Sequence, residues 1–187
     1  MNDARERILD ATLRLIGEKG IGAVTNRSVA TAAGVSLGTL TYHFANQTDL
    51  LRESLNRFVD AEIDRITAIV LNLADAGLAP DQAAEEVERT IAALTNATEH
   101  VANLELHLHA SRDPEMRVAA IRSVDAYDRL ALVVLEGLGV PDPARYAPTV
   151  VALLYGLAVR RLATGDASGT GTADALRLLL QGALAGS

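Results

Sequence analysis

Apolar residues recur at spacings of three and four along most of the 187-residue chain, which is the period of an α-helix. No stretch of any length alternates with the period of two that marks a half-buried strand. Residues 104–109 would be consistent with a strand in isolation, but the helical pattern on both sides of them favours helix. The sequence therefore predicts an all-α fold with about nine helices. The longer helical patterns cover about residues 4–19, 47–76, 81–110, 114–138, 143–163 and 173–184.

Capping residues define two short helices near the start of the chain. Thr25 precedes a short apolar-periodic stretch and is a good N-cap, and Gly34 is a typical stop after it. Ser36 can cap a further short helix that runs to about Phe44, since its hydroxyl accepts from an unpaired N–H of the first turn.

Two Asp-Pro pairs mark helix starts later in the chain. Asp113 and Asp142 are each followed by a proline, which suits the first position of a helix. We expect both aspartates to act as caps. A loop with three glycines, at residues 165–171, is predicted to precede the last helix.

The composition argues against several classes of protein. The chain has no cysteine, which excludes disulfides, a thiolate nucleophile and a Cys-ligated zinc site. The most apolar run, residues 147–157, is shorter than the ~18–20 residues that a membrane-spanning helix needs. The first residues do not resemble a signal peptide. We therefore expect a cytoplasmic protein without a membrane segment.

Charge is distributed unevenly. The formal net charge is −7, yet the residues up to Phe58 include seven basic and six acidic side chains. The remainder has ten basic and eighteen acidic side chains. A near-neutral first part on an acidic body is compatible with a polyanionic partner for that first part.

The two short helices around Gly34 have the layout of a helix-turn-helix, in which the second helix enters the major groove of DNA. Val29, Ala33, Val35 and Leu40 are the predicted inward positions. The polar and aromatic side chains of residues 41–43 then lie on other faces, with little core to fill. The alternative for Tyr42 and His43 is that they pack beneath the long helix that follows.

The first 58 residues resemble the DNA-binding head of the TetR family of bacterial transcriptional regulators. The resemblance covers about residues 5–58 and extends over more than twenty positions, whereas the rest of the chain agrees only in layout. The matching residues are Thr25, Arg27, Val29, Ala30, Ala32, Ala33, Gly34, Val35, Ser36, Gly38, Thr39, Leu40, Tyr42, His43, Phe44, Leu50 and Leu51.

The resemblance implies a role for each matched position. Thr25 and Ser36 would cap helices and contact phosphates, and Gly38 would let the backbone approach DNA. Thr39 and residues 41–43 would face the major groove or its rims, with the last two usually on the DNA backbone. The predicted DNA-contacting residues are Thr25, Arg27, Ser36, Leu37, Gly38, Thr39, Thr41, Tyr42, His43 and Gln47.

Two positions depart from the family pattern. Thr41 stands where the family often has an aromatic residue, and a threonine could instead contact a thymine methyl. Gln47 stands where a lysine is common, so the salt dependence of DNA binding should be shallower by up to about one counterion. Both departures concern the details of the DNA interface.

The body of such a regulator binds a small molecule, and residues 81–138 are the candidate ligand chamber. A few polar groups lie among the apolar residues of this segment, as in many ligand pockets. Glu105 and His109, four positions apart, could share a face and bind a metal, although solvated side chains are the expected reading and no metal or cofactor is predicted. The predicted ligand-binding residues are His100, Leu104, His107, Leu108 and Arg112.

The last two helices are apolar enough to pair with a second copy of the chain. Two helices per chain would form a four-helix interface in which Gly156 permits close approach. The alternative is that both are core helices of a monomer. The predicted interface residues are Val150, Leu153, Leu154, Leu157, Arg161, Leu176 and Leu180, and the predicted domains are residues 1–46 for DNA binding and 47–187 for ligand binding and dimerisation.

With the resemblance to the TetR family, these patterns lead us to expect a homodimeric repressor that a small molecule releases from a palindromic operator, with the long helix from Gln47 as the lever. The protein is not expected to be an enzyme. The alternatives are a helical enzyme or metal-binding protein that uses Glu105, His107 or His109, and a ligand-independent DNA binder or activator.

Overall fold

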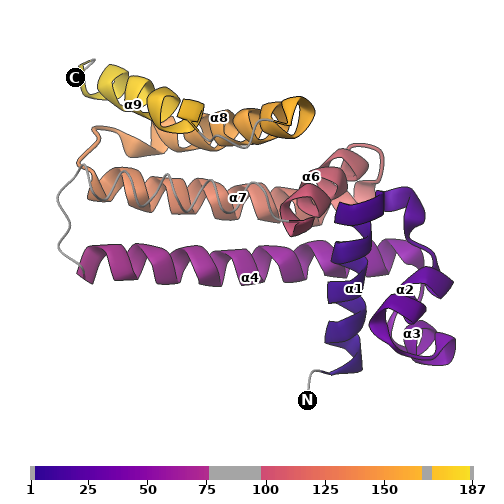
Figure 1. The fold of residues 1–187 in the computed structure, drawn as a ribbon. Coiled ribbons are helices and arrows are strands. Elements are labelled where there is room, and N and C mark those ends of the chain that lie inside the picture. The colour runs from indigo at the N-terminus through magenta and orange to yellow at the C-terminus, as the bar shows by residue number, and fades with distance from the viewer. Residues whose placement is uncertain (1–2, 76–97, 166–169, 186–187) are drawn as a thin grey trace. The chain divides into compact units, whose positions relative to one another are not determined.

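The computed structural model describes residues 3–75, 98–165 and 170–185, and these are almost entirely helical (Figure 1). No strand occurs among them, which confirms the all-α prediction. The elements are α1 (Ala4–Lys19), the short 3-10 helix η1 (Ile21–Ala23), α2 (Asn26–Ala33), α3 (Leu37–His43), α4 (Gln47–Asp75), α6 (Thr98–Ala110), α7 (Pro114–Gly137), α8 (Pro143–Thr164) and α9 (Thr170–Ala185).

The predicted boundaries hold to within a few residues. The first helix spans residues 4–19 as predicted, and the last begins at Thr170 rather than at residue 173. The helix predicted over residues 81–110 is described only from Thr98 onward, because residues 76–97 lie outside the described part of the chain. No described helix is long and apolar enough to cross a membrane.

The chain forms two compact units. Met1–Glu62 and Ala97–Val124 make up the first, and Ile63–Asn96 and Asp125–Ser187 make up the second. The division falls inside α4 and α7. The predicted domain boundary at residues 46 and 47 is a functional one and stays a prediction.

The core of the first unit is built around the apolar side of α1. Ile8 and Ile16 of α1 are fully buried, together with Val29 of α2 and Leu55 of α4. Leu40 fixes α3 to this core, since its side chain is also buried. Each such side chain contributes roughly 1.5–3 kcal/mol relative to an exposed one. The short helices α2 and α3 are therefore held by packing, because helices of their length are marginal alone.

α6 lies across the C-terminal end of α1 (Figure 1). A Cβ atom at Gly17 of α1 would lie 2.0 Å from the carbonyl oxygen of Thr98, the first residue of α6. Farther along α6, Ala102 and Leu106 are fully buried. Only glycine at position 17 allows the two helices to approach this closely.

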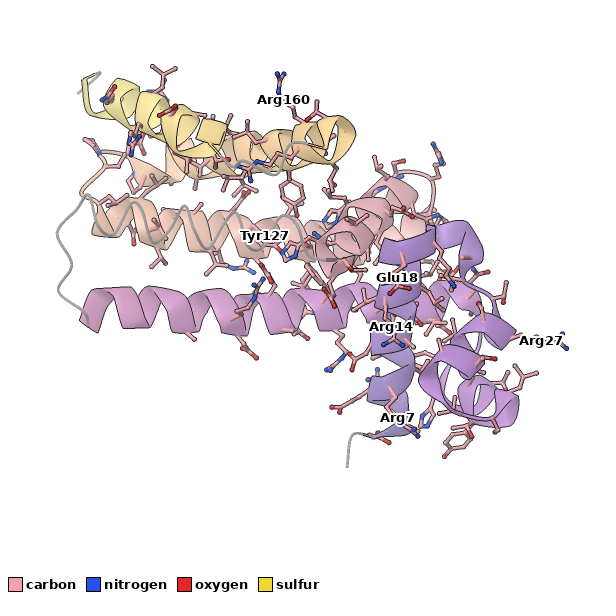
Figure 2. All side chains as sticks on the ribbon, in the orientation of Figure 1. Arg7, Arg14, Glu18, Arg27, Tyr127 and Arg160 are labelled. Atoms are coloured by element: carbon pink, nitrogen blue, oxygen red, sulfur yellow. The ribbon has the colours of Figure 1, made fainter. Side chains whose placement is uncertain are left out.

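In the second unit, α7, α8 and α9 pack around a cluster formed by Leu135, Val140, Ala147 and Val150. The rings of Tyr127 and Tyr155 meet edge to face, with 5.9 Å between their centroids. Figure 2 labels Tyr127 on α7.

The two Asp-Pro starts differ, which corrects one prediction. Oδ1 of Asp113 accepts hydrogen bonds from the N–H groups of Glu115 and Met116 and caps α7. Asp142 makes no side-chain cap to α8, and its backbone is left-handed, with φ 49° and ψ 55°. A side-chain cap requires an extended backbone at the capping residue. Pro143 does occupy the first position of α8, as predicted.

Candidate nucleic-acid interface

The helix-turn-helix is fixed by caps at both of its helices. Thr25 Oγ1 accepts from the Ser28 N–H at 3.1 Å, and Ser28 Oγ accepts from the Thr25 N–H at 2.9 Å, which completes a capping box at α2. Gly34 ends α2 in the left-handed conformation, with φ 64° and ψ 40°. Ser36 Oγ then accepts from the Thr39 N–H at 3.0 Å and caps α3. The predicted caps and turn are confirmed.

α3 buries one side and exposes the other. Leu40 and Phe44 are buried against the head, whereas Tyr42 is 86% exposed and Leu37 is 53% exposed. The alternative in which Tyr42 packs beneath α4 is therefore wrong. His43 is half-buried, and its ring meets Tyr42 edge to face at 5.2 Å. α3 thus presents an exposed aromatic and an exposed aliphatic side chain on a rigidly capped helix.

The remaining predicted positions lie around this exposed side of α3. Thr41 is exposed, and its hydroxyl donates back to the carbonyl oxygens of Leu37 and Gly38, 3.2 Å away in each case. Because the hydroxyl is engaged in these bonds, the methyl group is the part of the Thr41 side chain that is left to contact a partner. Gly38 is exposed and Thr39 is half-exposed, so the start of α3 is open to a partner.

Gln47 is exposed but already engaged. Its Nε2 donates to the carbonyl oxygen of Val24 at 2.8 Å, which links the start of α4 to the segment before α2. Asn46 caps α4, since its Oδ1 accepts from the Asp49 N–H at 2.8 Å. The Gln47 amide therefore holds the head together, a function that sequence reasoning missed because the two residues are 23 positions apart.

Arginines surround the exposed side of α3. Arg27 extends from α2 into solvent, and Arg7 lies on α1 (Figure 2). Arg5 pairs with Glu53 at 2.9 Å, and Arg52 pairs with Asp49 at 2.7 Å. A shallow depression of about 340 Å³ lies between Arg5 and Arg52, beside Tyr42 and His43. Asp49 and Glu53 line the same depression, so both of its arginines are already paired with carboxylates.

The predicted ligand-binding residues all lie on or just after α6, but they do not converge. His100 Nε2 lies 3.3 Å from Glu62 Oε1, and the His100 ring meets Phe58 edge to face at 5.2 Å. Leu104 is half-buried. In contrast, Leu108 is 70% exposed, and Arg112, which lies just after α6, is also exposed.

His107 lies on the buried side of α6. Its Nδ1 is 2.8 Å from the carbonyl oxygen of Asn103, and because a carbonyl only accepts, Nδ1 carries the proton. Burial lowers the pKa of His107 below the ordinary value of 6.5, and the bond to Asn103 opposes this effect. The His107 side chain is therefore neutral at physiological pH.

The pair Glu105 and His109 does not make a metal site within the described residues. The described parts of the chain bring no three His, Asp or Glu side chains within reach of one ion. Glu105 Oε2 instead accepts from the Ile21 N–H at 2.7 Å, and His109 lies 4.0 Å from Asp113.

The predicted dimer residues lie partly inside the protomer. Val150, Leu154 and Leu176 belong to or pack against the core of the second unit. Leu153 and Leu157 are half-buried, and the side chain of Leu180 lies outside the described residues. Arg161 is buried and donates to Thr172 Oγ1. Among the described side chains of these helices, the large apolar ones that face outward are Val159, Leu162 and Leu178, and none of them is among the predicted interface residues.

Two family models match the chain. The model described as "Bacterial regulatory proteins, tetR family" matches residues 8–54, and that described as "Tetracyclin repressor-like, C-terminal domain" matches residues 78–186. The HTH-type transcriptional repressor KstR of Mycolicibacterium smegmatis is 41% identical over 80 residues, which cover 43% of this chain and 37% of KstR. The chain spans about a third of the length of the curated relatives that it matches.

Solved structures match over nearly the whole chain. The SCO7518 protein of Streptomyces coelicolor A3(2) is 34% identical with a TM-score of 0.70, covering 95% of this chain and 98% of that one. The multidrug binding protein EbrR, in complex with imidazole, is 28% identical with a TM-score of 0.70 and covers 96% of each chain. Other structures of EbrR contain ethidium, proflavin or malachite green.

Proposed function

Because the chain belongs to the TetR family of bacterial regulatory proteins, we propose that it is a homodimeric, cytoplasmic repressor that a small molecule releases from a palindromic DNA operator. The observation that carries this proposal is the exposed side of α3. A large aromatic side chain at 86% exposure, on a helix fixed by caps and core packing, suits a partner surface rather than a core.

DNA is the partner that this surface fits best. α3 is the second helix of a helix-turn-helix, the one that enters the major groove. The Thr41 methyl and Leu37 offer apolar contacts to thymine, while Tyr42 and His43 offer donors to phosphate. Arg27 adds a positive charge at the start of α2, where the helix dipole also favours an anion.

Dimerisation supplies the second reading helix. Two half-sites of a palindrome require heads about 34–36 Å apart. Gly156 on α8 is exposed with open space around it, and Val159 lies on the same exposed side of that helix. On α9, Leu178 is 73% exposed. We propose that these outward residues, with Leu153 and Leu157, form the contact between two copies.

The effector site is proposed near α6, where His100 and His107 are partly or largely buried. Structures of the multidrug binding protein EbrR hold ethidium, proflavin or malachite green, and we propose that an aromatic compound of this kind is the effector of this chain. A compound of this kind releases DNA only if it binds more tightly to a state whose heads no longer fit the operator.

The test begins with purified protein and fragments of the promoter beside its own gene. Fluorescence anisotropy at low ionic strength should show binding to one fragment that survives excess competitor DNA. Sedimentation should show two copies of the chain per bound fragment. Binding to no fragment in preference to competitor would refute the proposal.

The effector arm adds ethidium, proflavin or malachite green to the bound complex. Release of DNA at a concentration that leaves a control helix-turn-helix protein bound would support an aromatic effector. This control is essential because ethidium and proflavin are planar and intercalate into DNA themselves. If neither the dyes nor a cell extract changes binding, the protein is a ligand-independent DNA binder.

A further inference from the structure

We propose that Glu105 of α6 positions the DNA-binding head through the hydrogen bond that its carboxylate accepts from the backbone N–H of Ile21. The distance from Ile21 N to Glu105 Oε2 is 2.7 Å, between residues 84 positions apart. This inference rests on the proposed function, because it concerns how the head is held for operator binding. Glu105 itself contacts no DNA in this scheme and is a positioning residue.

The bond lies where the chain leaves α1. Gly20 turns the backbone with φ 80° and ψ 161°, and η1 begins at Ile21. The first N–H groups of a helix have no partner within it, and a carboxylate is a strong acceptor for one of them. A Cβ on Gly20 would lie 3.7 Å from both carboxylate oxygens of Glu105. The carboxylate therefore lies directly against this turn and fixes where η1 starts.

η1 in turn holds the starts of two helices of the head. The carbonyl oxygen of Ala23 accepts from Ser28 Oγ at 2.7 Å, and Ser28 is part of the capping box of α2. The carbonyl oxygen of Val24 accepts from Gln47 Nε2 at 2.8 Å, and Gln47 is the first residue of α4. A displacement of Ile21 would therefore also displace the starts of α2 and α4, because each is hydrogen-bonded to one of the two residues that end this segment, Ala23 and Val24.

α6 is attached to other elements on both of its sides. Thr98 and Glu105 are seven positions apart, so they share one face about 10.5 Å apart along the helix, and both meet the end of α1 or the turn after it. His100 lies on a different face and contacts Glu62 and Phe58 of α4. A ligand that displaced α6 would act on Ile21 through Glu105.

The test uses the operator fragment selected above and three variants of the full chain. Glu105→Asp keeps the charge but shortens the side chain by one methylene, and Glu105→Gln keeps the length but removes the charge. Glu99→Gln, at an exposed position on the same helix, is the matched control. We expect Glu105→Asp to raise the operator Kd about tenfold and Glu105→Gln about threefold, as for loss or weakening of a charged hydrogen bond.

The direction of the change is diagnostic. Removal of a negative charge strengthens binding to DNA when only long-range electrostatics act, so Glu99→Gln should leave the Kd unchanged or slightly lower. Weaker binding by Glu105→Gln cannot arise from charge alone. Amide exchange measured by NMR should show the Ile21 N–H exchanging about tenfold faster in Glu105→Asp and unchanged in Glu99→Gln.

Thermal midpoints recorded in parallel separate local loosening from global unfolding. If Glu105→Asp does not fold, Glu105→Gln gives the same comparison. Operator affinity within twofold of wild type for both variants, or an Ile21 amide that stays protected in both, would overturn the inference. If the wild-type protein binds no DNA, the proposed function fails and the positioning role fails with it, while the exchange data still report on the bond itself.

Discussion

Gly17→Ala should destabilise the protein, although glycine to alanine inside a helix usually stabilises by about 1 kcal/mol. The added Cβ would lie 2.0 Å from Thr98 O, 2.5 Å from Thr98 Cγ2 and 2.8 Å from Thr98 C. Two of these three atoms belong to backbone, so a change of rotamer cannot relieve the contact. Reaching even ~3.0 Å requires α1 and α6 to separate by about 1 Å, and overpacking of this kind costs about 1–3 kcal/mol.

After the helix-propensity gain of about 1 kcal/mol is subtracted, we expect a net loss of up to about 2 kcal/mol, or a thermal midpoint lower by up to roughly 8 °C for a chain of this size. Midpoints are compared by circular dichroism at one protein concentration, because the proposed dimerisation would make them concentration-dependent. Gly137→Ala is the control, since a Cβ there would meet nothing within 4 Å, and its midpoint should be unchanged or raised by up to about 4 °C. A Gly17→Ala protein at least as stable as wild type would show that α1 and α6 are not closely packed at Thr98.

Three further predictions concern the DNA surface and the body. Tyr42→Ala should leave the free energy of unfolding, measured by denaturation, within about 0.5 kcal/mol of wild type. It should raise the operator Kd, measured by anisotropy, about tenfold. An unchanged Kd would show that Tyr42 does not belong to the DNA interface. Arg27→Ala should reduce the slope of log Kd against log salt concentration by about 0.9, and an unchanged slope would mean that Arg27 meets no phosphate. Because burial lowers the pKa of His107 below 6.5, the unfolded chain binds a proton there at higher pH than the folded protein does, so stability falls as pH drops below about 6.5. Urea midpoints at about pH 7.5 and 5.5 should therefore differ less in His107→Asn than in wild type, and an equal difference would contradict a depressed pKa at this residue.

The head could be predicted in detail because its signals are local. Thr25, Ser36 and Gly34 act within three or four residues of their partners, and the structure confirms each of them. The exposure of Tyr42 also follows from local reasoning, since Leu40 and Phe44 already fill the inward side of α3. The sequence thus contains enough information to predict both the helix-turn-helix and the side of α3 that faces outward.

The structure of the body was harder to predict from the sequence, because its decisive contacts join residues that are far apart in the chain. The close approach of Gly17 to Thr98 and the bond from Ile21 to Glu105 leave no periodic trace in the sequence. Glu105 and His109 share the i, i+4 spacing of a metal pair, yet Glu105 is used at the turn after α1. Likewise, apolar periodicity on α8 and α9 does not distinguish the side that covers the protomer's own core from the side open to a second copy.

The position of Arg5 has a practical consequence for purification. Its guanidinium lies 5.8 Å above the Phe44 ring and pairs with Glu53, so the start of α1 is tied to the end of α3. An affinity tag fused ahead of Asp3 would begin two residues before Arg5, which lines the same depression as Tyr42 and His43. A polyhistidine tag there would add titratable positive charge close to α3 and tighten nonspecific association with any duplex. Tags at that end should be cleaved before affinities are compared.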